Sequence, residues 1–160
     1  MAAGAEFGIK PFGIRAMDAM RLEKSYRLVG TELSIEYAAL ESGLHRFVHL
    51  NKGEFKGRQK LSQWQESGFA NTIVTLEVHD TTDADAIGGN PIRLPDGEVI
   101  GRATSGGYGF RLNKSLALAM VRPELAAVGT ELMIDVLDQC LRATVIEESP
   151  YDPDNQRLRA

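Results

Sequence analysis

The chain has 160 residues, of which 43% are hydrophobic and 25% charged, and its formal net charge is −4. This length suits one compact domain, and the composition is that of a globular protein rather than a disordered or collagen-like chain. Lysine and arginine are scattered without a basic run, which excludes nucleic acid as a main partner.

Cys140 is the only cysteine, so no intramolecular disulfide can form, as is usual in a reducing compartment. No apolar run is long enough to span a bilayer, and residues 1–10 lack the basic start and apolar stretch of a secretory signal. We therefore expect no membrane partner and a cytoplasmic location, with an organelle matrix as the alternative.

The sequence predicts a first helix over residues 13–26, bounded by Pro11 before it and Gly30 after it. Its apolar residues, Met17 and Met20 among them, fall on several faces. A helix that is apolar on several faces is usually buried against more than one neighbour.

Residues 44–50 favour a strand, and residues 57–66 favour a second helix that buries Leu61 and Trp64, which are three positions apart. These elements have many apolar residues and few strands of their own to cover them. We therefore interpret residues 1–67 as the end of a larger domain whose beginning is missing.

After Gly68 the hydrophobic period changes. Residues 72–79 alternate between apolar and polar side chains, which predicts a strand with one dry and one wet face. Proline and glycine in residues 94–98 predict a turn, and residues 99–104 a following strand. The glycine-rich residues 105–109 are expected to interrupt this pattern.

Three further apolar or alternating segments, residues 116–121, 132–136 and 141–147, are predicted strands, and residues 138–139 form a turn between the last two. Short strands at regular spacing indicate an antiparallel sandwich or barrel. The tail, residues 150–160, is polar and has no periodicity.

Two groups of residues invite a chemical interpretation that their spacing does not support. Gly106, Gly107 and Gly109 are not followed by the helix and lysine of a phosphate-binding loop, so we expect a close backbone approach at a bend or bulge. His45 and His49 are too few for a zinc site. We predict no metal.

Four motifs follow one another along the chain. Residues 16–33 contain RLE and then a glycine, residues 53–61 contain FKGR, residues 99–109 read VIGRATSGGYG, and residues 150–153 read PYDP. Together they resemble the glycine-cleavage T-protein (aminomethyltransferase) family over nearly the whole chain. Met17 stands where T-proteins usually carry arginine, and the RLEK and PYDP segments are more similar to sarcosine and dimethylglycine dehydrogenases.

The resemblance implies a mainly β fold with a minor α+β part: the end of an α+β folate-binding domain over residues 1–67, then an antiparallel β-barrel over residues 68–160. It implies tetrahydrofolate as cofactor, with FAD only in an upstream domain. The family's catalytic aspartate and its pteridine-binding glutamate would lie upstream of this sequence. We therefore expect the upstream half of the same enzyme as partner and no activity of the chain alone.

The same resemblance nominates three residues for folate binding. Tyr26 lies where an aromatic residue of the family lines the folate pocket, or else it is a packing tyrosine. Arg21 pairs with a folate carboxylate, or else forms a structural ion pair. Tyr151, near Asn155 and Arg157, lies where the family's C-terminus closes over the folate side.

The expected function is transfer of a one-carbon unit from glycine, sarcosine or dimethylglycine to folate by a protein of which this chain is the C-terminal part. Two alternatives stay open. One is a non-catalytic scaffold whose barrel faces an electron-transfer or carrier partner, and the other is a folate-dependent demethylase of the same family without FAD.

Overall fold

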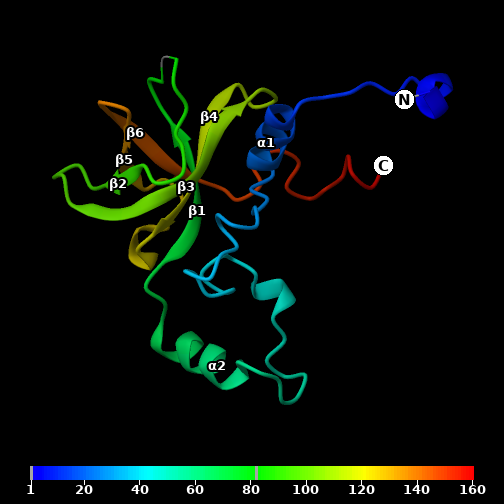
Figure 1. Ribbon diagram of the computed structural model, residues 1–160. Helices are drawn as coiled ribbons and strands as arrows, with labels where there is room; N and C mark the ends of the chain where they lie inside the picture. Colours follow the sequence, from blue (N-terminus) through cyan, green and yellow to red (C-terminus); the bar gives the residue numbers. More distant parts are fainter. Residues whose placement is uncertain (1, 82) are drawn as a thin grey trace.

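The computed structural model describes residues 2–81 and 83–160, and its central feature is a closed antiparallel barrel (Figure 1). The strand order around the barrel is β1-β4-β3-β2-β5-β6, and β6 pairs back onto β1. The strands are β1 (Thr72–Val78), β2 (Pro91–Arg93), β3 (Val99–Gly109), β4 (Lys114–Val121), β5 (Glu131–Val136) and β6 (Gln139–Ile146). This confirms the mainly β fold with an antiparallel barrel.

The barrel forms because every strand turns an apolar face inward, and β4 is buried on both faces, since Leu116 and Leu118 pack with Leu22 of helix α1 (Ile14–Glu23). In β5, Leu132, Ile134 and Val136 are buried while the residues between them are partly exposed, so the predicted alternation is confirmed. The core is filled by aliphatic side chains from all six strands, with Leu76 and Ile92 fully buried. Burial of such side chains is the main stabilising term of the fold.

The turn predicted at residues 94–98 joins β2 to β3. The amide of Gly97 donates to the carbonyl of Leu94 at 2.9 Å, and the amide of Leu94 donates to the carbonyl of Glu98 at 2.9 Å. Gly97 has φ +97°, a conformation that other residues rarely adopt. The turn prediction is therefore confirmed.

Strand β3 differs from the prediction, because it continues through residues 105–109 instead of being interrupted there. A β-bulge lies between Ala103 and Ser105. A Cβ at Gly106 would lie 2.1 Å from the carbonyl oxygen of Ala86, so glycine is needed where the segment before β2 crosses the strand. The predicted close backbone approach at a bend or bulge is confirmed, and it lies beside a bulge within a continuous strand.

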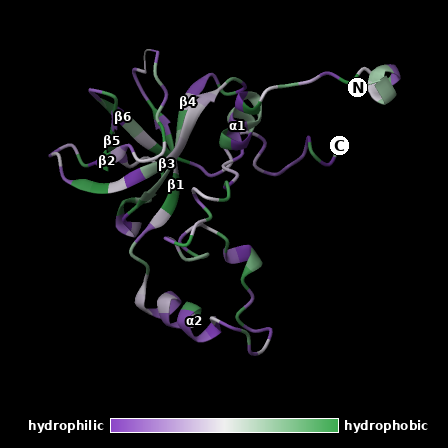
Figure 2. Cartoon of the chain, in the orientation of Figure 1, coloured by the Kyte–Doolittle hydropathy of each residue, from purple (hydrophilic) through white to green (hydrophobic). Residues whose placement is uncertain are grey.

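The helical part of the chain lies to one side of the barrel. Helix α1 (Ile14–Glu23) packs against β3 and β4, and α2 (Arg58–Ser67) lies away from the barrel in Figure 1. Figure 2 shows α2 as largely hydrophilic. Short 3-10 turns are η1 (Ala2–Phe7), η2 (His45–Phe47) and η3 (Pro123–Leu125).

Three predictions for this part are wrong. Residues 44–50 form no strand, because no neighbouring strand is available to pair with them, and they contain η2 instead. Helix α1 is not buried on several sides: Met17 and Met20 are 41% and 51% exposed. Helix α2 contains no buried residue, so Leu61 and Trp64 are only half-buried.

An apolar contact of Leu22 with Leu116 and Leu118, together with buried carboxylates, fixes this part to the barrel. Glu23 accepts from the amide of Arg111 at 2.6 Å, at the turn between β3 and β4. Glu41 accepts from the amides of Ala38 at 2.8 Å and Asn71 at 3.0 Å, at the start of β1. The division near residue 68 stays a prediction.

Neither α1 nor α2, the α-helices in the described part of the chain, has the length and hydrophobicity of a transmembrane helix. Within residues 2–81 and 83–160, no three His, Cys, Asp or Glu side chains gather as metal ligands would.

Candidate functional site

The end of helix α1 determines where Tyr26 lies. The amide of Tyr26 donates to the carbonyl of Arg21 at 2.8 Å, and the amide of Ser25 donates to that of Leu22 at 2.9 Å. These two bonds are those of a Schellman motif, with Ser25 in the left-handed conformation that glycine usually occupies (φ +52°). The chain therefore turns sharply at Ser25 and leaves the Tyr26 ring on the surface, 45% exposed.

Ser25 keeps this conformation because its hydroxyl is held by the barrel and the tail. Its Oγ lies 2.7 Å from Oγ1 of Thr75 in β1 and accepts from the amide of Ser149 at 3.0 Å. A non-glycine residue in the left-handed region costs about 1–2 kcal/mol, which these bonds offset.

Tyr26 and Tyr151 line the same hollow, which we call the tail hollow and which has a volume of about 330 Å³. It lies between the end of α1, the β3–β4 turn and the C-terminal tail. Its lining residues are Met20, Glu23, Lys24, Tyr26, Arg111, Tyr151, Asp152, Asn155, Arg157 and Leu158. The structure thus brings together two of the three predicted site residues, as well as Asn155 and Arg157.

The C-terminal tail is fixed over this hollow by polar contacts with α1. The amide of Tyr151 donates to the carbonyl of Glu23 at 3.0 Å. Lys24 Nζ donates to the carbonyl of Asp152 at 2.6 Å and to Oδ1 of Asn155 at 2.7 Å. Lys24 is therefore a structural residue here, which the sequence did not indicate.

A second hollow, the loop hollow, lies on the other side of Tyr26 and has a volume of about 660 Å³. Basic and aromatic side chains on its wall include Arg27, His45, Arg46 and Phe47. We call the residues that line the tail hollow and the loop hollow, with Tyr26 between them, the Tyr26 surface.

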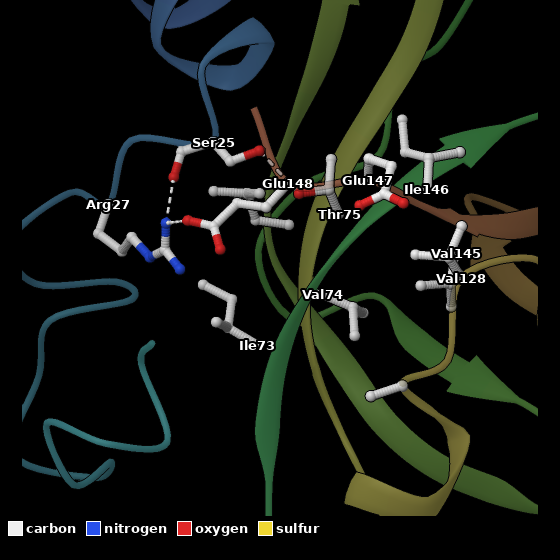
Figure 3. A pocket seen from close by; sticks show the side chains of 12 residues that line it. Ser25, Arg27, Ile73, Val74, Thr75, Val128, Val145, Ile146, Glu147 and Glu148 are labelled. Carbon is white, nitrogen blue, oxygen red and sulfur yellow. Dashed lines mark hydrogen bonds and ion pairs between the residues drawn. The ribbon is translucent and has the colours of Figure 1, made fainter. Parts of the chain in front are cut away.

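Arg27 separates the loop hollow from a third, smaller hollow of about 210 Å³ at the barrel wall (Figure 3). Its Nη1 donates to the carbonyl of Ser25 at 2.8 Å and to Oε1 of Glu148 at 2.5 Å. Valines 74, 128 and 145 line this third hollow. It is small, and its one arginine is paired with Glu148, so we assign it no ligand.

Arg21 does not line the tail hollow or the loop hollow. Its side chain is 12% exposed, and its guanidinium donates to Oδ1 of Asp18 at 3.0 Å and to Oγ of Ser105 at 3.0 Å. Nη1 also lies 3.7 Å from Oε2 of Glu32. Arg21 thus has carboxylate partners within this chain, and its assignment to folate stays a prediction.

Glu32 is a residue that the sequence did not single out. It is 0% exposed, and a buried carboxylate stays charged only where donors surround it. Burial alone raises its pKa, but four donors favour the charged form more strongly and bring the pKa below its ordinary value. Those donors are the hydroxyls of Ser105, Thr104 and Thr31 and the amide of Leu28.

The chemistry of the Tyr26 surface suits a ligand with a flat aromatic body and an anionic end. Tyrosine rings offer faces for a planar ring system. Arg157 lies 5.9 Å from the Tyr151 ring centroid, and Arg111 lines the same hollow. Guanidinium groups bind carboxylates in bidentate geometry. These residues therefore fit part of a folate, which combines fused rings, a benzoyl ring and glutamate carboxylates.

The closed six-stranded barrel, with a helix and a tail against one side, is the architecture of aminomethyltransferase C-terminal barrels. The structure of the glycine cleavage system aminomethyltransferase T from Bartonella henselae aligns with a TM-score of 0.81. It is 22% identical, and the alignment covers 88% of this chain and 39% of that one.

Sequence comparison gives the family. The chain belongs to the family of the glycine cleavage T-protein C-terminal barrel domain, whose model matches residues 71–152. The model of the GCVT N-terminal domain matches residues 1–52. The predicted family resemblance is thereby confirmed.

Curated relatives are of two kinds. Human mitochondrial dimethylglycine dehydrogenase is 40% identical over 99% of this chain and 18% of its own length, and the mouse enzyme is 41% identical over 92% and 17%. The aminomethyltransferase of Moorella thermoacetica is 37% identical over 92% of this chain and 39% of its own length. The chain thus spans less than half of each relative. A cytoplasmic location stays a prediction, since these dehydrogenases are mitochondrial.

Proposed function

We propose that this chain forms one wall of the tetrahydrofolate site of an aminomethyltransferase-type protein, which passes a one-carbon unit from glycine, sarcosine or dimethylglycine to folate. The observation that carries the proposal is the tail hollow, which Tyr26 and Tyr151 line together with Arg111 and Arg157. Membership of the T-protein barrel family and the names of the relatives support it.

Bound tetrahydrofolate supplies an amine nitrogen that accepts the one-carbon unit. The residues of this chain bind and orient it. The Tyr26 ring packs against a planar part of the ligand, and Arg111 or Arg157 pairs with its carboxylates. The tail, fixed by Lys24, excludes water from one side. Proximity of two held reactants accounts for most of such an acceleration.

The proton-transfer groups of the proposed reaction come from outside this sequence. The resemblance places the family's catalytic aspartate and its pteridine-binding glutamate upstream. We therefore propose that the chain works with the upstream half of the same protein, which has FAD only if the protein is of the dehydrogenase type. The short share of each relative that the chain covers supports this proposal.

A second candidate function, a non-catalytic scaffold, is supported by the exposed apolar face of α1. Ile14, Met17 and Met20 are 71%, 41% and 51% exposed, and apolar side chains gathered in this way mark contact surfaces. In this alternative the face of α1 would dock against a partner, and the tail hollow would have no ligand.

Calorimetric titration with folinic acid, a stable reduced folate, separates the two functions. We expect saturable binding, roughly tenfold weaker in Tyr26→Ala because an aromatic contact of this kind is worth about 1.4 kcal/mol. Tyr26→Phe distinguishes the ring from the hydroxyl. Phe7→Ala is the matched control, because it removes an aromatic side chain that is 82% exposed and lines neither hollow. Equal affinity of wild type and Tyr26→Ala would contradict the proposed site. The titration is repeated with the upstream half restored: binding only by the extended chain would indicate a site completed upstream, and absence of binding by both would favour the scaffold.

A further inference from the structure

The buried carboxylate of Glu32 joins the segment after α1 to strand β3. Its Oε1 accepts from Oγ1 of Thr104 and from Oγ of Ser105, both at 2.6 Å. Successive residues of a regular strand point to opposite faces, but here the bulge between Ala103 and Ser105 lets both hydroxyls reach one oxygen. The bulge thus creates a binding place for this carboxylate on the outside of the barrel.

The other carboxylate oxygen holds the chain beside Tyr26. Oε2 of Glu32 accepts from the amide of Leu28 at 2.8 Å, two residues after Tyr26. Arg21 completes the connection: its Nη1 lies 3.7 Å from the same oxygen and donates to the carbonyl of Tyr26 at 3.3 Å. Its Nη2 donates to Oγ of Ser105 at 3.0 Å, so the hydroxyl bridges Arg21 and Glu32.

We propose that Glu32 is a positioning residue for the Tyr26 surface: with Arg21 it holds the backbone of residues 26–28 against the bulge of β3 and so sets where the Tyr26 ring points. The amide of Tyr26 is bonded to Arg21, and its carbonyl is bonded to the guanidinium that Glu32 faces. Tyr26 is 45% exposed, so we infer that its backbone, rather than packing of its ring, sets its place. The inference rests on the proposed function only for its consequence on folate affinity.

The charge and the shape of Glu32 can be separated. In Glu32→Gln, the amide oxygen can keep the bond from Leu28, and the amide nitrogen can face the hydroxyls of Thr104 and Ser105, which accept as well as donate. The variant keeps the volume and loses the charge opposite Arg21. Ser105→Ala removes only the bridging hydroxyl and is the second variant if Glu32→Gln does not fold.

The control is Glu41→Gln, which changes another buried glutamate. Glu41 accepts from the amides of Ala38 and Asn71, neither of which lines the tail hollow or the loop hollow. A backbone N–H can only donate, whereas a hydroxyl can donate or accept. One of the two amides therefore faces the glutamine NH₂ group and loses its acceptor, so we expect Glu41→Gln to lose at least as much stability as Glu32→Gln. It therefore reports what general destabilisation does to the Tyr26 surface.

The experiment records the ring signals of Tyr26 and the amide signals of residues 26–28 by nuclear magnetic resonance, together with folinic acid affinity, in wild type and the variants. We expect Glu32→Gln and Ser105→Ala to shift these signals and to weaken folinic acid binding, by roughly tenfold for Glu32→Gln. Glu41→Gln leaves both unchanged.

Unshifted signals in Glu32→Gln and Ser105→Ala, or equal shifts in Glu41→Gln, would overturn the positioning role. If wild type does not bind folinic acid even with its upstream half restored, the proposed function fails, and the Tyr26 signals alone still decide whether Glu32 positions this residue.

Discussion

Replacing Gly106 with alanine should destabilise the barrel strongly, because the new methyl group has no room. A Cβ at Gly106 would lie 2.1 Å from the carbonyl oxygen and 2.6 Å from the carbonyl carbon of Ala86. Ordinary contacts of this kind need more than 3 Å, so two backbone segments must separate by on the order of 1 Å. Overpacking against side chains costs about 1–3 kcal/mol, and here both partners are backbone, so we expect about 3 kcal/mol or more.

Gly107→Ala in the same strand is the matched control. Its Cβ would meet only Cδ1 of Leu22, at 3.1 Å, and the end of a leucine side chain can move aside. We expect this variant to lie within about 1 kcal/mol of wild type. Urea unfolding followed by circular dichroism measures both, and the midpoint of Gly106→Ala should fall by about 1–2 M. If Gly106→Ala unfolded at the same midpoint as Gly107→Ala, the packing of the Ala86 segment across β3 would be refuted.

Three further outcomes are expected. Leu22→Ala should lose about 2–5 kcal/mol of unfolding free energy, since Leu22 is 1% exposed and packs on Leu116 and Leu118. Met20, half-exposed on the same helix, is the control. An equal loss in Met20→Ala would contradict the packing of α1 through Leu22. Ser25→Ala should lose about 1–3 kcal/mol of unfolding free energy, measured by denaturant titration, because the bonds of its hydroxyl are removed. Ser25→Gly should lose about 1 kcal/mol less, because glycine adopts the left-handed conformation without strain. A reversed order would show that this conformation is unstrained in the wild type. Because the pKa of Glu32 is lowered in the folded state, its carboxylate stabilises the fold above its ordinary pKa near 4.5, and that stability is lost as the pH falls through the lowered value. Wild type should therefore lose more unfolding free energy than Glu32→Gln between about pH 5 and about pH 3, and parallel losses would refute the assignment.

The sequence predicted most of the barrel because β1, β4, β5 and β6 satisfy a local rule, whereas the three-residue strand β2 was not predicted. Residues 72–79 and 132–136 alternate between apolar and polar side chains, and this alternation follows directly from one face being dry. The length of strand β3 was underestimated because glycine is uncommon in strands. Glycine is needed at position 106 because of Ala86, twenty residues earlier, and no local pattern shows this contact. Residues 44–50 have strand-like composition but no partner strand.

The candidate site was predictable only in part. Tyr26 and Tyr151 are 125 positions apart, and the resemblance to a known family, rather than periodicity, brought both to attention. Glu32 gave no signal, because an isolated glutamate between a threonine and a leucine is ordinary, and its hydroxyl partners Thr104 and Ser105 are 72 and 73 positions away. Buried polar networks formed by distant segments follow from the fold and cannot be found by local pattern.

The most direct test of the central claim is to map folinic acid binding by the amide chemical shifts of the chain. The account predicts that the largest changes gather in residues 20–28 and 151–158, which include most of the residues that line the tail hollow and some that line the loop hollow. Changes gathered elsewhere on the barrel, or no change at saturating folinic acid even with the upstream half restored, would contradict the proposal that this surface is a wall of the folate site.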